Sequence, residues 1–172
     1  RNPKSAFMKI LGIDPGLQAT GYGVVDGAGG GSHPTLVEAG VIRTRRENDL
    51  ADRLVEIHEG LASVLAEFNP DAVAVEELYA HYKHPRTAIL MGHARGAIFL
   101  AAAEAGKPVA SYNATKIKKS LTGSGHASKV QMQRAIQAAF GLAEPPQPPD
   151  VADALAVALC HAHRTARITH AP

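Results

Sequence analysis

The chain has 172 residues and a mass of 18.0 kDa, which suits one domain with one hydrophobic core and excludes a need for disulfide or metal staples. Hydrophobic residues make up 45% of it, which argues against global disorder. A formal net charge of +2 neither requires nor excludes a nucleic-acid partner, because the local distribution of charge matters more than the total.

Cysteine usage and the absence of long apolar runs bear on the compartment. Cys160 is the only cysteine, so no internal disulfide can form. No segment approaches the ~20 apolar residues of a membrane helix, and residues 1–7 do not lead into a signal peptide. We expect a cytoplasmic protein whose single domain spans residues 8–165. Residues 1–7 would be an N-terminal extension or cloning remnant before Met8, and residues 166–172 a C-terminal tail.

Short apolar runs that end in turn residues predict strands, since their length is too small for a buried helix. The first run ends at Asp14-Pro15-Gly16, and the fourth, AVAV, is followed at once by Glu76. Short links between the first three, one of them a glycine-rich loop, predict an antiparallel start to the sheet. The predicted strands span residues 8–13, 20–25, 35–44, 72–75 and 109–112.

Helical periodicity begins after the third strand. Apolar residues then recur three and four apart, which predicts an amphipathic helix that Asn48 or Asp49 can cap. The predicted helices span residues 49–68, 87–105, 113 or 115 to 121, 128–140, and 150 to about 165. The order predicts an α/β domain with a five-stranded mixed sheet flanked by helices on both faces.

Four carboxylates stand at positions that invite a functional interpretation. Asp14 and Glu76 each end an apolar strand, where an unpaired charge is expensive to bury, although either one alone is more simply an exposed strand-end acid. Asp150 and Asp153 lie three apart on one face of the last helix, in its first turn. Taken by itself, this pair is better explained as acids at a helix N-terminus.

The four acids together suggest more than each does alone. Carboxylate oxygens are hard ligands that suit Mg²⁺ or Mn²⁺, and no cysteine and histidine set has zinc spacing. Two such ions about 4 Å apart can activate a water and stabilise a leaving oxygen in phosphodiester hydrolysis. The sequence therefore predicts a site for two-metal phosphoryl transfer.

Five short segments, in order, resemble the RuvC family of Holliday-junction resolvases. The similarity runs from about residue 8 to residue 163, and its strength lies in the order and spacing of motifs that are individually weak. The segments are ILGIDPG at residues 10–16, TGYG at 20–23, AVEE at 74–77, GHARG at 92–96 and DVADALA at 150–156.

The resemblance implies a ribonuclease H-like fold and an endonuclease that nicks two opposing strands of a four-way DNA junction, leaving 5′-phosphate and 3′-hydroxyl ends. It implies that Asp14, Glu76, Asp150 and Asp153 are the catalytic acids and hold two divalent ions, Mg²⁺ or Mn²⁺. On this basis Asp14 would contact both ions, Glu76 one, and Asp150 with Asp153 the other. The implied partners are a second copy of the chain and the RuvA–RuvB branch-migration complex.

The resemblance also implies DNA contacts. Lys118 and Lys129 match basic positions that the family has near the DNA backbone, and Lys116 and Lys119 are weaker candidates for the same role. Tyr79 matches an aromatic residue that meets bases at the junction. A solvated lysine and a locally packed tyrosine are the plainer alternatives. On charge alone, the acid-free run that contains the four lysines is explained equally well by an acidic partner and by a solvated face.

Other features leave alternatives open. Gly92 and Gly96 permit a close helix contact, either inside the monomer or in a dimer. The loop over residues 122–127, which includes His126, is a weak candidate for contacts to DNA. A metal bound by His161 and His163 is disfavoured, because alternate residues on a helix point apart. The competing functions are a nuclease for another branched DNA or RNA, a non-catalytic junction binder and, less favoured, an actin-like ATPase domain.

Overall fold

The computed structural model describes residues 8–27, 33–78 and 85–169. Within these ranges, five strands form one mixed sheet in the order β3-β2-β1-β4-β5. β1, β2 and β3 pair antiparallel, and β4 and β5 add to the other side of β1 in parallel. The strands are β1 (Met8–Asp14), β2 (Ala19–Gly27), β3 (Thr35–Arg43), β4 (Ala72–Glu76) and β5 (Val109–Tyr112).

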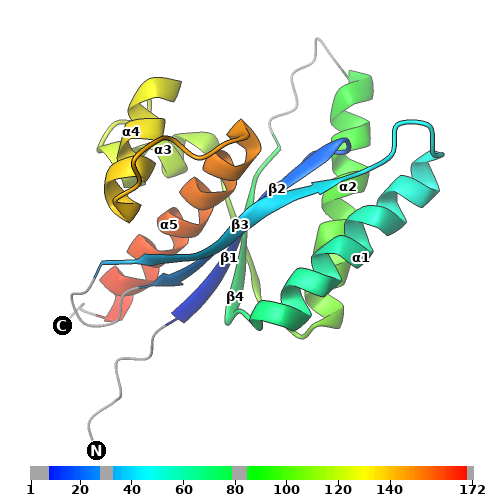
Figure 1. The fold of residues 1–172 in the computed structure, drawn as a ribbon, viewed down its shortest axis with the longest axis horizontal. Helices are drawn as coiled ribbons and strands as arrows, with labels where there is room; N and C mark the ends of the chain where they lie inside the picture. The colour runs from blue at the N-terminus through cyan, green and yellow to red at the C-terminus, as the bar shows by residue number, and fades with distance from the viewer. Residues whose placement is uncertain (1–7, 28–32, 79–84, 170–172) are drawn as a thin grey trace, which may run out of the picture.

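Helices cover both faces of this sheet, as predicted (Figure 1). One face carries α1 (Leu50–Phe68) and α2 (Pro85–Glu104), which pack against each other. The other face carries α5 (Pro149–Thr169), with α3 (Ala114–Thr122) and α4 (Lys129–Phe140) packed on it. None of the described helices is both long and apolar enough to cross a membrane.

The alternation of side chains along the strands divides the core into two parts. On β1, Ile10 faces the layer of α5 while Leu11 and Ile13 face α1 and α2. β4 is buried on both faces, which explains its unbroken apolar sequence. The side of α5 that packs on the sheet is buried, and it includes Val151, Ala154, Leu155, Ala158 and Leu159.

The helix ends differ from the prediction by a few residues. α2 begins at Pro85 rather than at residue 87, and α5 continues to Thr169 rather than ending near residue 165. Asp49 occupies the N-cap position of α1, but its side chain makes no capping hydrogen bond. Asn113 does cap α3, because its side chain accepts from the backbone N–H of Lys116.

Candidate active site

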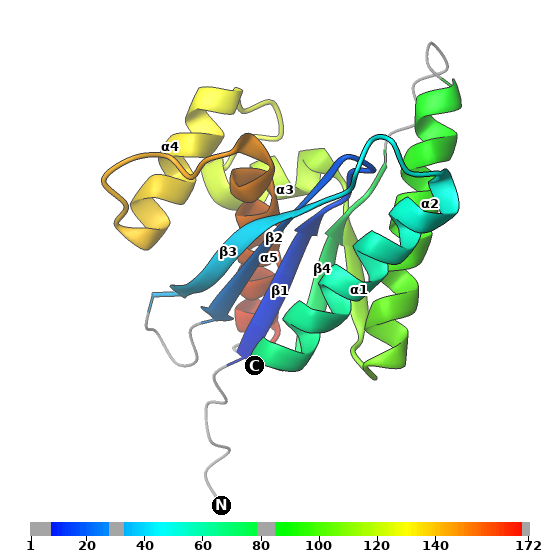
Figure 2. The same cartoon turned by 45° about the vertical axis from the view of Figure 1, so that its right-hand side comes forward.

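Asp14 and Glu76 lie side by side at one edge of the sheet. Ile13 and Val75 are partners in the parallel β1–β4 pair, and the two acids are the next residues along each strand. The carboxyl ends of both strands lie at the upper edge in Figure 2, where α5 begins. The antiparallel strands and parallel crossover therefore bring acids that are far apart in the sequence to one place.

Glycines in β1 and β2 allow α5 to lie directly on the strand backbones. A Cβ atom added to Gly12 would stand 2.2 Å from the carbonyl oxygen of Ala154, and one added to Gly21 would stand 2.1 Å from that of Asp150. Real Cβ atoms do not approach backbone oxygens so closely, so these positions exclude any other residue without a shift of the helix. This close approach sets the first turn of α5 beside Asp14.

Burial and mutual repulsion perturb the acids that this packing brings together. The pKa of Asp14 is raised from 3.8 to about 8, first by burial and then by the charges of Glu76, Asp153 and Asp150. Burial also raises the pKa of Glu76, with a further contribution from Asp153. Asp153, at the exposed rim, has a pKa raised by desolvation and by Asp150. The site is therefore poor in compensating positive charge.

Two lysines supply the positive charge that is present. Lys129 lowers the pKa of both Asp14 and Asp153, and Lys118 lowers that of Glu76. Neither lysine forms an ion pair within 4 Å of an acid among the described residues. Both remain available to an anionic ligand at the site.

The donor set fits hard divalent cations. Among the described residues, no hydrogen-bond donor or ion-pair partner engages the carboxylates of Asp14, Glu76, Asp150 and Asp153. Desolvated, mutually repelling oxygen ligands of this kind are stabilised by Mg²⁺ or Mn²⁺. In the same ranges, no three Asp, Glu, His or Cys side chains converge as a closed ligand cage. The acids therefore surround a common region without meeting at one point.

Two hollows meet at Glu76. The first, which we call the strand-end cleft, has a volume of about 730 Å³ and runs from Asp14 and Glu76 past Asn113 to Thr87 and Met91 on α2. The second, which we call the lysine-side cavity, has a volume of about 210 Å³ and lies between α3, α4 and α5. It is lined by Glu76, Ala114, Ile117, Lys118, Lys129, Met132, Gln133, Ile136, Ala152, Asp153 and Ala156.

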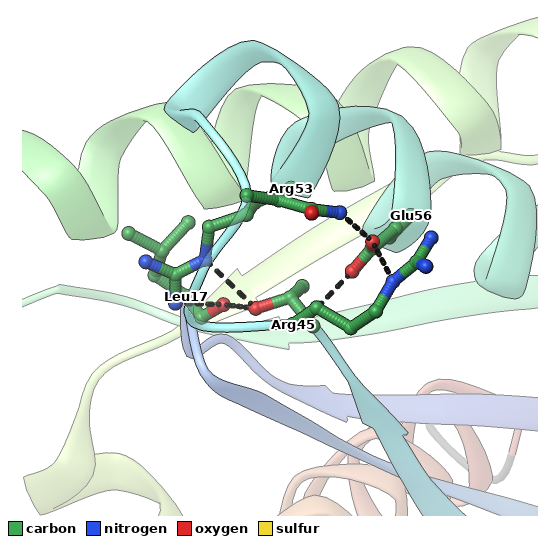
Figure 3. A network of polar contacts seen from close by, with 6 residues as sticks. Leu17, Arg45, Arg53 and Glu56 are labelled. Carbon is green, nitrogen blue, oxygen red and sulfur yellow. Dashed lines mark hydrogen bonds and ion pairs between the residues drawn. The ribbon is translucent and has the colours of Figure 1, made fainter.

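A polar network holds the turn that follows Asp14 (Figure 3). The carbonyl of Leu17 accepts from the hydroxyl of Thr44 at 2.7 Å and from the guanidinium of Arg53 at 3.2 Å. Arg53 also donates to the Thr44 hydroxyl at 3.0 Å. On the solvent side of the network, Nε of Arg45 and Oε1 of Glu56 form an ion pair at 3.0 Å. The network fixes this turn against β3 and α1.

The structure separates the predicted DNA-binding lysines into two groups. Lys118 and Lys129 line the lysine-side cavity, whereas Lys116 and Lys119 are exposed and line neither hollow. Tyr79 lies outside the described residues.

The structure also gives the histidines and the loop other contacts. His161 contacts Tyr112 and His163 contacts Ser120. His126 is exposed, in a loop closed by contacts of Thr122 and Ser124.

Sequence reasoning missed several residues that build the site. Gly12 and Gly21 set the helix position, Thr44 and Arg53 hold the turn, and Gln133 lines a hollow. The one usable signal was the alternation of Gly21 and Gly23, which puts two glycines on the same face of β2. Nothing in the local sequence marks the remaining residues.

Sequence comparison identifies close relatives. A family model described as crossover junction endodeoxyribonuclease RuvC matches residues 10–161. The protein of that name from Rhodopirellula baltica is 54% identical over 151 residues, which cover 88% of this chain and 84% of the relative. The one from Halorhodospira halophila is 46% identical over 164 residues and 95% of each chain.

Structural comparison agrees. The RuvC structure from Thermus thermophilus superposes with a TM-score of 0.86 at 39% identity and covers 94% of this chain and 97% of its own. The same enzyme in complex with a Holliday junction substrate gives a TM-score of 0.87, with the same identity and coverage. A yeast mitochondrial Holliday junction resolvase, 14% identical, has a TM-score of 0.71 over 98% of this chain and 85% of its own, which shows a shared fold alone.

Proposed function

Because the chain belongs to the RuvC family of crossover junction endodeoxyribonucleases, metal-dependent nucleases with a ribonuclease H-like fold, we propose that it resolves four-way DNA junctions by nicking two opposing strands. The observation that carries this proposal is the group of carboxylates around Asp14, where burial and the charges of the neighbouring acids raise the pKa of Asp14 to about 8. We also propose that residues 8–165 form one nuclease domain.

The proposed metal ligands are the four acids. Asp14 would contact two divalent ions, Mg²⁺ or Mn²⁺, with Glu76 on one and Asp150 and Asp153 on the other. When bound, such ions supply Lewis-acid activation of the phosphodiester and of a water. The chain's own contribution is to hold four oxygen donors around one region by means of β1, β4 and α5.

The proposed DNA contacts lie on either side of these acids. Lys118 and Lys129 would hold phosphates of the strand being cut, since they line the lysine-side cavity and carry no ion pair in the described ranges. Lys116 and Lys119 would add more distant backbone contacts. Tyr79 would stack on a base at the junction, a role that rests on the family resemblance.

A dimer formed through α2 would give one active site for each of the two strands. An added Cβ on Gly92 or Gly96 would meet no atom within 4 Å, so neither glycine serves packing inside the monomer. On the same stripe of the helix, Ile89 is 62% exposed and Leu100 is 54% exposed. Two copies of this face can pack about a two-fold axis that matches the paired strands of a junction. The RuvA–RuvB partnership rests on resemblance.

One cleavage assay tests the activity. Wild-type protein and Asp14→Asn are incubated with a four-way junction and with linear duplex of the same sequence, in Mg²⁺, in Mn²⁺ and in chelator. We expect wild type to cut only the junction, symmetrically and only with metal, and Asp14→Asn to bind it without cutting. Equal cutting of duplex or other branched DNA would replace the proposed substrate, and full activity of Asp14→Asn would remove the proposed site.

Sedimentation tests the dimer. Wild type should sediment as a dimer at micromolar concentration, and Gly96→Glu, which places charge on the exposed stripe of α2, should sediment as a monomer. His58→Gln, which changes a side chain of α1 bound to Glu104, is the control that should remain dimeric. A wild-type monomer at this concentration would contradict the proposal.

A further inference from the structure

The lysine-side cavity is too small for another element of secondary structure and too specific in its lining to be a packing defect. Its volume of about 210 Å³ lies below the ~300–1,000 Å³ of pockets that take drug-sized ligands. It therefore suits a group the size of one heterocyclic ring. Glu76 and Asp153 line it, so its occupant lies next to the reacting phosphate of the proposed function.

The inner wall of this cavity is apolar. Ile117 and Ile136, which are 4% and 1% exposed, form it together with Met132. A phosphate would lose its hydration against such a wall and gain no hydrogen bond there. The flat face of a nucleobase, in contrast, packs well against aliphatic carbon and the methionine sulfur.

Gln133 provides the polar group that such a ligand requires. Its half-buried side chain lines the cavity, and in the described part of the chain no group hydrogen-bonds its amide. The other glutamines of α4 are both engaged: Gln131 accepts from the backbone of Ser128, and Gln137 donates to a carbonyl at 2.9 Å. A free amide offers two donors and one acceptor, the pattern that reads a base edge.

The lysines fit the same occupant. Lys118 and Lys129 also line the cavity, and each acts electrostatically on the carboxylates. A nucleotide whose base enters the cavity would leave its phosphate among these lysines, which contribute affinity without reading sequence. Recognition of the base would then depend on the amide.

We infer that the lysine-side cavity binds one unstacked nucleobase of the strand being cut, directly next to the scissile phosphate, and that Gln133 selects its identity. This inference rests on the proposed function, because it places the base of a DNA substrate beside the four acids. Its consequence is a base preference at one position next to the cut, imposed by α4 rather than by the junction's branched shape.

The first experiment measures base preference. We compare cleavage of junctions that carry each of the four bases at the positions flanking the cut. The proteins are wild type, Gln133→Met and the matched control Gln137→Met. Methionine keeps the length of the glutamine side chain but removes the amide. We expect Gln133→Met to lose about ten-fold discrimination at one flanking position, the amount one amide–base pair supports. Gln137→Met should keep the wild-type pattern, and thermal melting checks that both variants are folded.

The second experiment detects the unstacked base directly. 2-Aminopurine replaces each flanking base in turn, and its fluorescence is recorded on binding in Ca²⁺, with binding followed separately by anisotropy. We expect a rise at the position whose preference depends on Gln133. Fluorescence that stays quenched at every position, or an unchanged base pattern in Gln133→Met, overturns the inference. The proposed function stands in that case if wild type still cuts junctions, and it fails only if wild type does not.

Discussion

The phenol oxygen of Tyr112 and Nδ1 of His161 lie 2.8 Å apart in a buried hydrogen bond that joins β5 to α5. Their rings also meet edge to face, with centroids 5.8 Å apart. Tyr112 is the register partner of Glu76, and its carbonyl accepts from the backbone N–H of Glu77 at 2.9 Å. One tyrosine therefore ties the strand end that bears Glu76 to the helix that bears Asp153.

Removing the phenol hydroxyl should weaken this connection. Tyr112→Phe keeps the ring but leaves Nδ1 of His161 without its hydrogen-bond partner. His161 is only 8% exposed, and its Nε2 already lacks a partner in the described structure. We expect a loss of about 1–3 kcal/mol in the free energy of unfolding, measured by urea denaturation. Junction cleavage should slow while junction binding is unchanged.

A double-mutant cycle distinguishes the hydrogen bond from general packing. Tyr112→Phe, His161→Phe and the double variant should show a coupling energy of about 1 kcal/mol. Strictly additive effects would mean that the two side chains stabilise the protein independently.

The pKa of Asp14 makes the metal-free protein less stable as pH rises. The pKa of Asp14 is 3.8 in an ordinary environment and about 8 in the folded protein. Between about pH 4 and pH 8, the folded chain therefore holds a proton that the unfolded chain has released. The stability contributed by this proton is present below about pH 4 and is lost as pH rises through 8. Asp14→Asn should therefore be more stable than wild type in chelator, by an amount that grows with pH and levels off above pH 8 at roughly 5 kcal/mol.

Thermal melts at pH 6, 7.5 and 9, with and without Mn²⁺, measure this effect. Manganese should raise the melting temperature of wild type, most strongly at high pH, and should raise that of Asp14→Asn much less. Glu47→Gln, which neutralises an exposed acid before α1, is the control and should follow wild type. A stability difference for Asp14→Asn that does not change with pH would contradict the assigned titration.

The sequence predicted those parts of the fold and site that depend on local pattern. The apolar runs located all five strands, and an acid immediately after such a run located Asp14 and Glu76. Helical spacing placed Asp150 and Asp153 on one face. A shared site was expected from the acid set and from the family resemblance. Local pattern does not show how the helix acids reach the strand acids, because that depends on the contact of Gly21 with the backbone of Asp150, which belongs to tertiary packing.

The lysines show the same limit. Lys116, Lys118 and Lys119 lie on one short helix, and only the packing of α3 on α5 determines that Lys118 faces the acids. Gln133 had no local signal either, since α4 carries three glutamines and only the fold distinguishes the one whose amide has no hydrogen-bond partner among the described residues. Whether a side chain has a hydrogen-bond partner depends on tertiary packing, so a pattern along the sequence does not reveal it.

A methyl group on Gly21 should displace the first turn of α5. In Gly21→Ala the new Cβ would stand 2.1 Å from the carbonyl oxygen of Asp150, so the helix must move away from β2. We expect a folded protein, destabilised by about 1–3 kcal/mol as in other overpacked sites, with weaker stabilisation by Mn²⁺. Gly27→Ala is the control on the same strand, because its new Cβ would stand 3.0 Å from the nearest atom, the carbonyl oxygen of Met8, and far less adjustment is needed there. Unaltered metal-dependent melting in Gly21→Ala would show that the close approach does not position Asp150.

The network around Leu17 should matter more on its inner side than on its solvent side (Figure 3). Arg53→Met keeps the apolar stem but removes the donors to Leu17 and Thr44, and we expect a loss of about 1–2 kcal/mol because two acceptors lose a charged partner. Arg45→Met is the matched control. Its side chain is 71% exposed, so solvent screens its ion pair with Glu56 and the variant should be nearly as stable as wild type.

Metal titration distinguishes a role in stability from a role in the site. Because the Leu17 carbonyl lies three residues after Asp14, Arg53→Met should also raise the Mn²⁺ concentration that gives half-maximal stabilisation, while Arg45→Met should leave it unchanged. The measurement is the melting temperature against Mn²⁺ concentration, with each variant referred to its own metal-free value. Equal midpoints for both variants would mean that the turn after Asp14 keeps its shape without Arg53, and that the strand and helix packing alone position the carboxylate.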